Sequence, residues 1–198
     1  MSIILDKVCE YPEVSVLLEI MKLSNSETYL HSVSVAKYVE MIVNIDNGWT
    51  DEQKEQIVIG ALLHDIGKIF VPLNLTQLPR TLTPQEFDII KVHASVSYEI
   101  VRNSFSMIVQ NICLYHHEKP NGKGYMNKMP LCSIPDEALL VQVADVYDAL
   151  TSTRSYKVKY EPQKAIDIME ADATKLILDD RYVNKLKKCL IKKGDIKI

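Results

Sequence analysis

Residues 57 to 68 read Ile57-Val58-Ile59-Gly60-Ala61-Leu62-Leu63-His64-Asp65-Ile66-Gly67-Lys68. The first seven residues are apolar or small, as in a helix that lies inside a protein core. An ionised carboxylate at the end of such a segment is costly to bury unless it is paired or bound to a metal. The stretch therefore predicts a buried helix that ends at a polar site, where a partner compensates the charge of Asp65.

Helical patterns flank this stretch on both sides, and strand-like alternation is nearly absent. Upstream, Ser24-Asn25-Ser26-Glu27 offers a capping signal for a helix that stops near Asn47-Gly48. Downstream, Thr83 and Pro84 have the residue types of an N-cap and a first helical position. Further helices are expected at residues 14–23, 51–64, 106–117 and 136–151 and twice within 162–193, with a loop at 71–81. The pattern predicts an all-α fold, a single helical bundle over residues 1–198.

Composition limits the classes of partner. The chain has 198 residues and a formal net charge of -3, which argues against a nucleic-acid polymer as partner. A small anionic substrate stays compatible with this charge, because a bound metal adds local positive charge. No apolar run is long enough to span a bilayer. The four cysteines are scattered and form no C-x-x-C pair, so we expect reduced thiols in a cytoplasmic protein.

The chain contains five histidines, which are His31, His64, His93, His116 and His117. Any one of them alone is more readily explained as an ordinary surface or core histidine. Two pairs have a context that favours chemistry, since His64-Asp65 and His116-His117 each end an apolar helix. The second pair also precedes a glycine-rich loop, Pro120 to Tyr125, of the kind that often binds ligands. Imidazoles beside carboxylates suit iron, manganese, zinc or nickel.

Four motifs surround these histidines and follow one another in order. They are Leu63-His64-Asp65-Ile66-Gly67-Lys68; the helix start from Leu82 to Ile90, which leads into His93; His116-His117-Glu118 with Asn121-Gly122-Lys123-Gly124-Tyr125; and Ala144-Asp145-Val146-Tyr147-Asp148-Ala149-Leu150-Thr151-Ser152 with Arg154 and Lys157. The set resembles the motifs of the HD-GYP subfamily of HD-domain metal-dependent phosphohydrolases. His31 lies upstream on its own helix, as the first histidine of the subfamily does. With it, the matches run in order from about Glu27 to Lys157 and use every histidine. The resemblance implies a helical bundle of the HD-domain type, followed by helices within 162–193.

The resemblance also implies roles for individual residues. Asp65 would bridge two divalent transition metals, of which iron or manganese are favoured and zinc or nickel are also accepted. Glu27 lies one helical turn before His31 and would hold a third metal, or else it serves the helix N-terminus. The implied metal ligands are Glu27, His31, His64, Asp65, His93, His116, His117 and Asp145.

The remaining implied roles concern the substrate. Asp65 and Lys68 would be catalytic, and Lys68, Arg154 and Lys157 would hold phosphates, with ordinary surface ion pairing as the alternative. Gly124 and Tyr125 would line the substrate site. Two metals would generate hydroxide near neutral pH and neutralise charge on the phosphate oxygens.

The reaction implied by the resemblance opens cyclic di-GMP to the linear dinucleotide, with or without further cleavage to GMP. Two alternatives stay open: an HD-type phosphohydrolase that acts on another nucleotide or phosphoester, and a catalytically silent nucleotide-binding module. Three positions depart from the subfamily pattern, with Leu78 for a lysine, Asn121 for an aspartate and Met126 for the proline of G-Y-P. None is a proposed ligand, so any difference is expected in specificity. Because the motifs begin within the first thirty residues, we expect no sensory domain and regulation through expression, a partner protein or a homo-oligomer.

Overall fold

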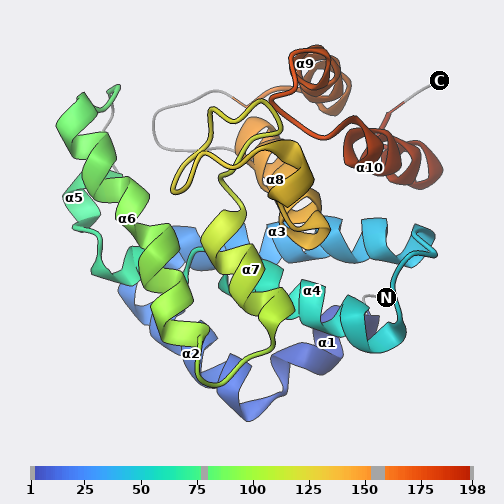
Figure 1. The fold of residues 1–198 in the computed structure, drawn as a ribbon. Coiled ribbons are helices and arrows are strands. Elements are labelled where there is room, and N and C mark those ends of the chain that lie inside the picture. Colours follow the sequence, from blue (N-terminus) through green and yellow to red (C-terminus); the bar gives the residue numbers. More distant parts are fainter. Residues whose placement is uncertain (1–2, 77–79, 153–158, 197–198) are drawn as a thin grey trace.

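The computed structural model describes residues 3–76, 80–152 and 159–196. In these ranges helices are the only regular secondary structure, which confirms the predicted all-α class (Figure 1). The α-helices are α1 (Ile3–Cys9), α2 (Pro12–Ser24), α3 (Ser26–Ile45), α4 (Asp51–Leu63), α5 (Leu73–Thr76), α6 (Pro84–Val101), α7 (Met107–Tyr115), α8 (Asp136–Thr151), α9 (Pro162–Thr174) and α10 (Asp180–Lys193). Two 3-10 helices, η1 (Ile66–Phe70) and η2 (Leu131–Ser133), lie in the connections.

Several helix starts follow from local side-chain chemistry. Thr83 and Glu86 form a reciprocal capping box at the start of α6, with Pro84 in the first turn, and Asn25 caps α3 by accepting the backbone N–H of Thr28. The expected loop at 71–81 was wrong in part, because α5 forms one turn inside it. Pro72 precedes this turn, and a proline is compatible with a helix start.

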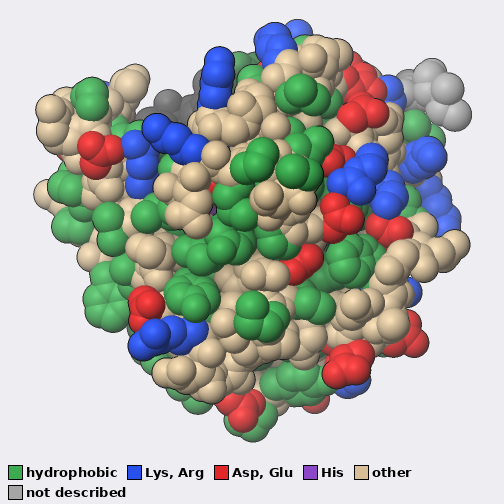
Figure 2. Space-filling model, in the orientation of Figure 1, with side chains coloured by type: hydrophobic (Ala, Val, Ile, Leu, Met, Phe, Trp, Pro, Cys, Tyr) green, Lys and Arg blue, Asp and Glu red, His purple; other side chains and the backbone are tan. Residues whose placement is uncertain are grey.

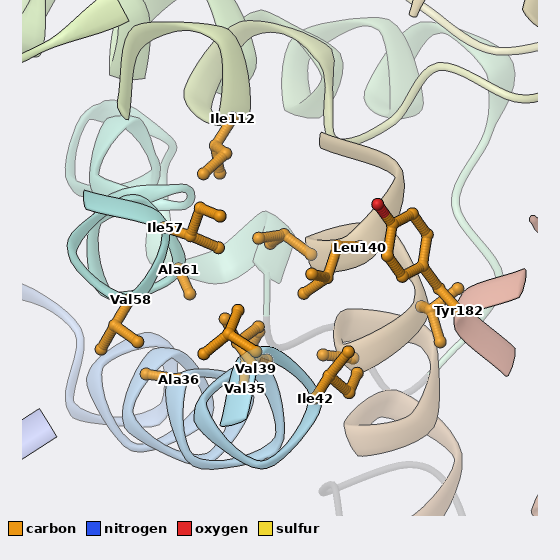
Figure 3. Close-up of a cluster of buried hydrophobic side chains, with 14 of the residues drawn as sticks. Val35, Ala36, Val39, Ile42, Ile57, Val58, Ala61, Ile112, Leu140 and Tyr182 are labelled. Carbon is orange, nitrogen blue, oxygen red and sulfur yellow. The ribbon is translucent and has the colours of Figure 1, made fainter. Parts of the chain in front are cut away.

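The core lies where α3, α4, α7 and α8 meet. Figure 3 shows side chains of α3 and α4 facing each other, with Ile112 of α7 and Leu140 of α8 closing the cluster. The predicted burial of the apolar helix is confirmed, since every residue from Ile57 to Leu63 is buried. Gly60 lets α4 approach α7, because a Cβ there would lie 2.4 Å from Cδ1 of Ile112. Among the described residues, no helix has both the length and the apolar character of a membrane span.

Candidate metal centre

The C-terminal end of α4 delivers His64 and Asp65 into the interior of the bundle. His64 caps α4, and the 3-10 helix η1 starts directly after Asp65. Gly67 lets η1 pack on α6, since a Cβ at this position would lie 2.3 Å from the carbonyl oxygen of His93. The backbone N–H of Gly67 also donates to Oγ of Ser97 at 2.8 Å. This close packing places Asp65 beside His93.

Six predicted ligands gather in two groups that share Asp65. Asp65, His93, His116 and His117 form one group, and His31, His64 and Asp65 form the other; within each group the nearest ligand atoms lie within 4.8 Å of one another. Oδ1 of Asp65 lies 3.1 Å from Nε2 of His93 and 3.8 Å from Nε2 of His116. Oδ2 lies 3.4 Å from Nε2 of His64 and 3.7 Å from Nε2 of His31. The two carboxylate oxygens thus face different histidine groups.

The histidines are oriented by bonds at the ring nitrogen that faces away from the centre. Nδ1 of His64 lies 2.8 Å from the carbonyl oxygen of Ala61, and Nδ1 of His93 lies 2.6 Å from that of Ile90. Nδ1 of His116 lies 3.0 Å from the carbonyl oxygen of Ile112. A carbonyl only accepts, so these Nδ1 atoms donate and each Nε2 of a neutral ring carries a lone pair. Metal-binding histidines commonly have this arrangement.

The inward-facing nitrogens fit a bound cation. Nε2 of His93 lies 3.4 Å from Nε2 of His116 and 3.1 Å from Nε2 of His117, where lone pairs would repel one another. Nε2 of His64 is buried and has no hydrogen-bond partner among the described residues. Burial, followed by the charges of His64 and His93, lowers the pKa of His116 to about 3. His116 is therefore neutral at pH 7, and its Nε2 lone pair is available to a divalent metal.

Helix α8 contributes two aspartates to the second group. Oδ1 of Asp145 lies 2.9 Å from Nε2 of His31, and Oδ2 of Asp148 lies 2.6 Å from Nδ1 of the same ring. Burial disfavours the charged imidazole, but the hydrogen bonds to Asp145 and Asp148 outweigh it and raise the pKa of His31 to about 9. The sequence reasoning assigned a role to Asp145 and none to Asp148. The spacing of three residues on one helix was the available signal, since it places both side chains on one side.

Lys68 lies at the edge of the same site. Its Nζ is 2.5 Å from Oδ2 of Asp65, and its side chain stays partly exposed. Burial raises the pKa of Asp65, but the charges of Lys68 and His64 outweigh burial and hold this pKa well below its usual range. Asp65 is therefore ionised, as a metal ligand must be.

Glu118 organises the loop that follows the histidine pair. Its side chain is fully buried and accepts the backbone N–H groups of Asn127, Lys128 and Met129. Gly124 lies against the same turn, because a Cβ there would be 2.5 Å from Cα of Glu118. The sequence reasoning gave Glu118 no role of its own, since its partners are backbone groups of an irregular loop.

The loop also places an aromatic ring on a predicted ligand. Tyr125 stacks on the ring of His117, with centroids 4.5 Å apart and an interplanar angle of 27°. Its backbone N–H donates to the carbonyl oxygen of His117 at 3.2 Å. Gly124 and Tyr125, both expected at the substrate site, thus lie beside the histidine cluster.

Other expected site residues are not brought into these groups. Glu27 lies half-buried in the first turn of α3, and among the described residues it belongs to neither metal-type cluster. Arg154 and Lys157, the expected phosphate-binding residues, lie outside the described residues, as does Leu78.

Comparison with known proteins identifies the family to which the chain belongs. A model described as HD domain matches residues 15–181, most of the chain. The chain belongs to the HD domain family. This confirms the predicted resemblance to HD-domain proteins. The matched range contains the His64-Asp65 pair, and Asp65 is the residue that both clusters share.

Characterised relatives of this HD domain carry phosphodiesterase names. The chain is 34% identical over 169 residues to a cyclic di-GMP phosphodiesterase of Thermotoga maritima, a match that covers 81% of the chain and 46% of the relative. It is 37% identical over 142 residues to the cyclic di-GMP phosphodiesterase response regulator RpfG of Xanthomonas campestris, covering 70% of the chain and 37% of the relative. The chain therefore spans less than half the length of these two relatives.

A solved structure confirms the fold. Bd1817, an HDG"Y"P protein from Bdellovibrio bacteriovorus, matches with a TM-score of 0.68 at 21% identity, covering 95% of the chain and 68% of that protein. At this identity the match establishes the arrangement of helices. The predicted bundle of the HD-domain type is thus confirmed.

Proposed function

We propose that this HD domain is a metal-dependent phosphodiesterase that opens cyclic di-GMP to the linear dinucleotide and can cut it further to GMP. The observation that carries the proposal is the position of Asp65, whose two oxygens face two separate histidine groups. A carboxylate between two such groups suits a two-metal site for phosphoester hydrolysis. The names of the relatives support the choice of cyclic di-GMP.

The proposed ligands are the residues of the two clusters together with Asp145, and they would hold two divalent metals. Glu27 would add a third metal if its side chain turned toward His31, which lies one turn later on α3. Iron or manganese are the favoured metals, and zinc or nickel also accept imidazole and carboxylate ligands. Bound metals would supply a hydroxide nucleophile near neutral pH and would neutralise charge on the phosphate.

The protein's own charged groups would bind and orient the substrate. Lys68, whose Nζ is held at the edge of the site by Asp65, places one positive charge where a phosphate oxygen would enter. Arg154 and Lys157 are proposed to hold the substrate phosphates. Gly124 and Tyr125 would form the wall of the site next to His117.

The second candidate is an HD-type phosphohydrolase with another nucleotide or phosphoester substrate. Met126 favours it, because this residue follows Tyr125 in the wall and is partly exposed, at 38% of its surface. A proline would fix φ at this position, whereas methionine does not. A silent nucleotide-binding module is the third candidate; it is disfavoured because the proposed ligand set is complete in sequence.

Product analysis separates these candidates. Anaerobically purified, metal-loaded protein is incubated with cyclic di-GMP, cyclic di-AMP and bis(p-nitrophenyl) phosphate, and the products are resolved by chromatography. Asp65→Asn tests the site, and Asp167→Asn, on the exposed face of α9, is the matched control. We expect linear dinucleotide or GMP from the parent and the control, and at least a 100-fold loss in Asp65→Asn, roughly the contribution of a disrupted metal site. Turnover of the simple phosphodiester without any cyclic dinucleotide would favour the second candidate, and no turnover of any substrate would favour the third.

A further inference from the structure

A buried glutamine holds the turn that carries His117. Gln142 lies on α8, and its Nε2 donates to the carbonyl oxygen of His116 at 3.2 Å and also to that of Glu118. The side-chain amide has two N–H donors, so each carbonyl receives one of them. The two accepting residues directly flank His117 in the chain. Gln142 therefore fixes the backbone on both sides of a proposed metal ligand.

These bonds supply donors that the end of α7 lacks. Helix α7 ends at Tyr115 with His116 as its C-cap, and the last carbonyl groups of a helix have no donor within the helix. His116 and Glu118 are fully buried, and Gln142 exposes only 3% of its surface. Figure 2 shows hydrophobic side chains gathered over α7 and α8 on the face it presents. Removal of the amide would thus leave two buried carbonyls without a donor.

Core packing does not explain a glutamine at this position. Its neighbours on α8, Leu140, Val141 and Val143, are apolar and buried. Oε1 of Gln142 is itself buried and has no hydrogen-bond partner among the described residues. A buried oxygen without a partner destabilises the fold, so the bonds made by Nε2 are the part of this side chain that benefits the structure.

His117 depends on its backbone more than the other histidines do. Each of the other four has a carbonyl or carboxylate oxygen 2.6 to 3.0 Å from its Nδ1. Nδ1 of His117 has no such partner in the part of the chain that the structure describes. Its ring instead stacks on Tyr125. A stacked pair tolerates a range of offsets, so the position of the backbone determines where Nε2 of His117 lies.

Helix α8 also contributes to the second histidine group. Asp145 lies three residues after Gln142, nearly one helical turn, and its Oδ1 is 2.9 Å from Nε2 of His31. The same helix thus binds the turn of His117 through one side chain and the His31 group through another. This arrangement fixes the two histidine groups relative to each other.

We propose that Gln142 is a positioning residue that orients His117 and thereby sets the affinity of one of the two proposed metal positions. That position is the one formed by Asp65, His93, His116 and His117. The other position has only Asp65 in common with it and no ligand on the turn that Gln142 holds, so its affinity should change little. The inference rests on the proposed two-metal site and adds the residue that distinguishes its two positions.

Cobalt titration of the metal-free protein tests the proposal. Co²⁺ accepts imidazole and carboxylate ligands, and its visible absorbance reports each binding step. We expect the parent to bind at least two ions per chain. In Gln142→Met, whose side chain has a similar length and no donor, one step should weaken by about 10- to 100-fold, as is typical when an outer partner of a ligand is lost. The other step should stay within about 2-fold of the parent, as for an independent site.

A second background separates positioning from a general effect on the fold. His117→Ala removes the ligand itself, so Gln142→Met should then reduce cobalt affinity by less than about a further 2-fold. A merely structural role would weaken cobalt binding equally with and without His117. Circular dichroism verifies that each variant is folded. If Gln142→Met does not fold, Gln142→Asn, which keeps the amide but shortens its reach, takes its place in the same comparison.

Another glutamine provides the matched control. Nε2 of Gln110 on α7 also donates to two backbone carbonyl oxygens, those of Arg102 at 3.1 Å and Phe105 at 2.7 Å. Neither accepting residue belongs to the proposed site, so Gln110→Met should leave both cobalt steps unchanged. Equal cobalt binding by the parent and Gln142→Met, or equal losses with and without His117, would overturn the inference while the proposed metal centre stands. A parent that binds no cobalt would overturn the proposed metal centre and the inference together.

Discussion

Replacement of Gly67 by alanine should disturb both the stability and the metal affinity of this HD domain. A Cβ at residue 67 would lie 2.3 Å from the carbonyl oxygen of His93 and 2.7 Å from the backbone nitrogen of Ser97, whereas real Cβ atoms essentially never come closer than 3.0 Å. Both neighbours are backbone atoms, which cannot rotate away. The 3-10 helix η1 must therefore move from α6 by at least about 0.7 Å, the difference between the required and the available distance.

That displacement has two measurable consequences. Overpacking in a core typically costs about 1–3 kcal/mol of unfolding free energy, which for a protein of this size corresponds to a fall in Tm of roughly 2–12 °C. Asp65 lies two residues before Gly67, and the affected carbonyl belongs to His93, whose Nε2 is 3.1 Å from Oδ1 of Asp65. Metal sites tolerate errors of only about 0.5 Å in ligand position, so metal affinity should fall by about 10-fold or more.

Thermal unfolding by circular dichroism and elemental analysis measure the two effects. Gly48→Ala is the control, because this glycine is exposed and its added Cβ would come no closer than 3.3 Å to another atom, Oδ1 of Asp46. The control should unfold within about 1 °C of the parent. A Gly67→Ala protein with the Tm and the metal content of the parent would refute the argument from packing.

Three further changes have expected outcomes. Asp148→Asn should weaken metal binding by about 10- to 100-fold, because it removes the carboxylate that orients His31, and an equal affinity in metal titration would contradict this. Glu118→Ala should lower the free energy of unfolding in urea by about 3 kcal/mol or more, since three backbone N–H groups lose their buried acceptor; a loss below about 1 kcal/mol would show that water replaces it. Burial raises the pKa of Asp46, but its bonds to Lys185 and to the backbone of residue 48 outweigh this and lower it. Asp46→Asn should therefore lower the free energy of unfolding by about 1 kcal/mol at pH 7. The difference in unfolding free energy between parent and variant should shrink as the pH falls below about 4. A difference that stays constant down to pH 2 would exclude this ionic contribution.

The sequence predicted the helices well where short-range chemistry defines them. The N-cap at Thr83, followed by Pro84, and the apolar segment that ends at His64 both appear in the structure as expected. Helix α8 begins at Asp136 and ends at Thr151, as predicted. The one-turn helix α5 was missed, because the prolines of this segment indicate a loop, and a helix of four residues has too little periodicity to be recognised.

The sequence identified most residues of the site, but not the contacts that orient them. All five histidines converge with Asp65 in the structure, as the motif order indicated. The contacts that hold them could not be read from the sequence, because they join distant segments: Asp148 lies 117 residues from His31. Glu118 likewise binds backbone groups, which carry no sequence signature.

Metal stoichiometry tests the central claim most directly. The parent and Asp65→Ala are purified anaerobically, and transition metals per chain are counted by elemental analysis. Asp65 belongs to both histidine groups, so the account predicts two or three metals in the parent and a loss at both positions in the variant, which should retain less than about one metal per chain. A variant that keeps the full metal content of the parent, or a parent that binds none, would contradict the assignment of Asp65 as the bridging ligand.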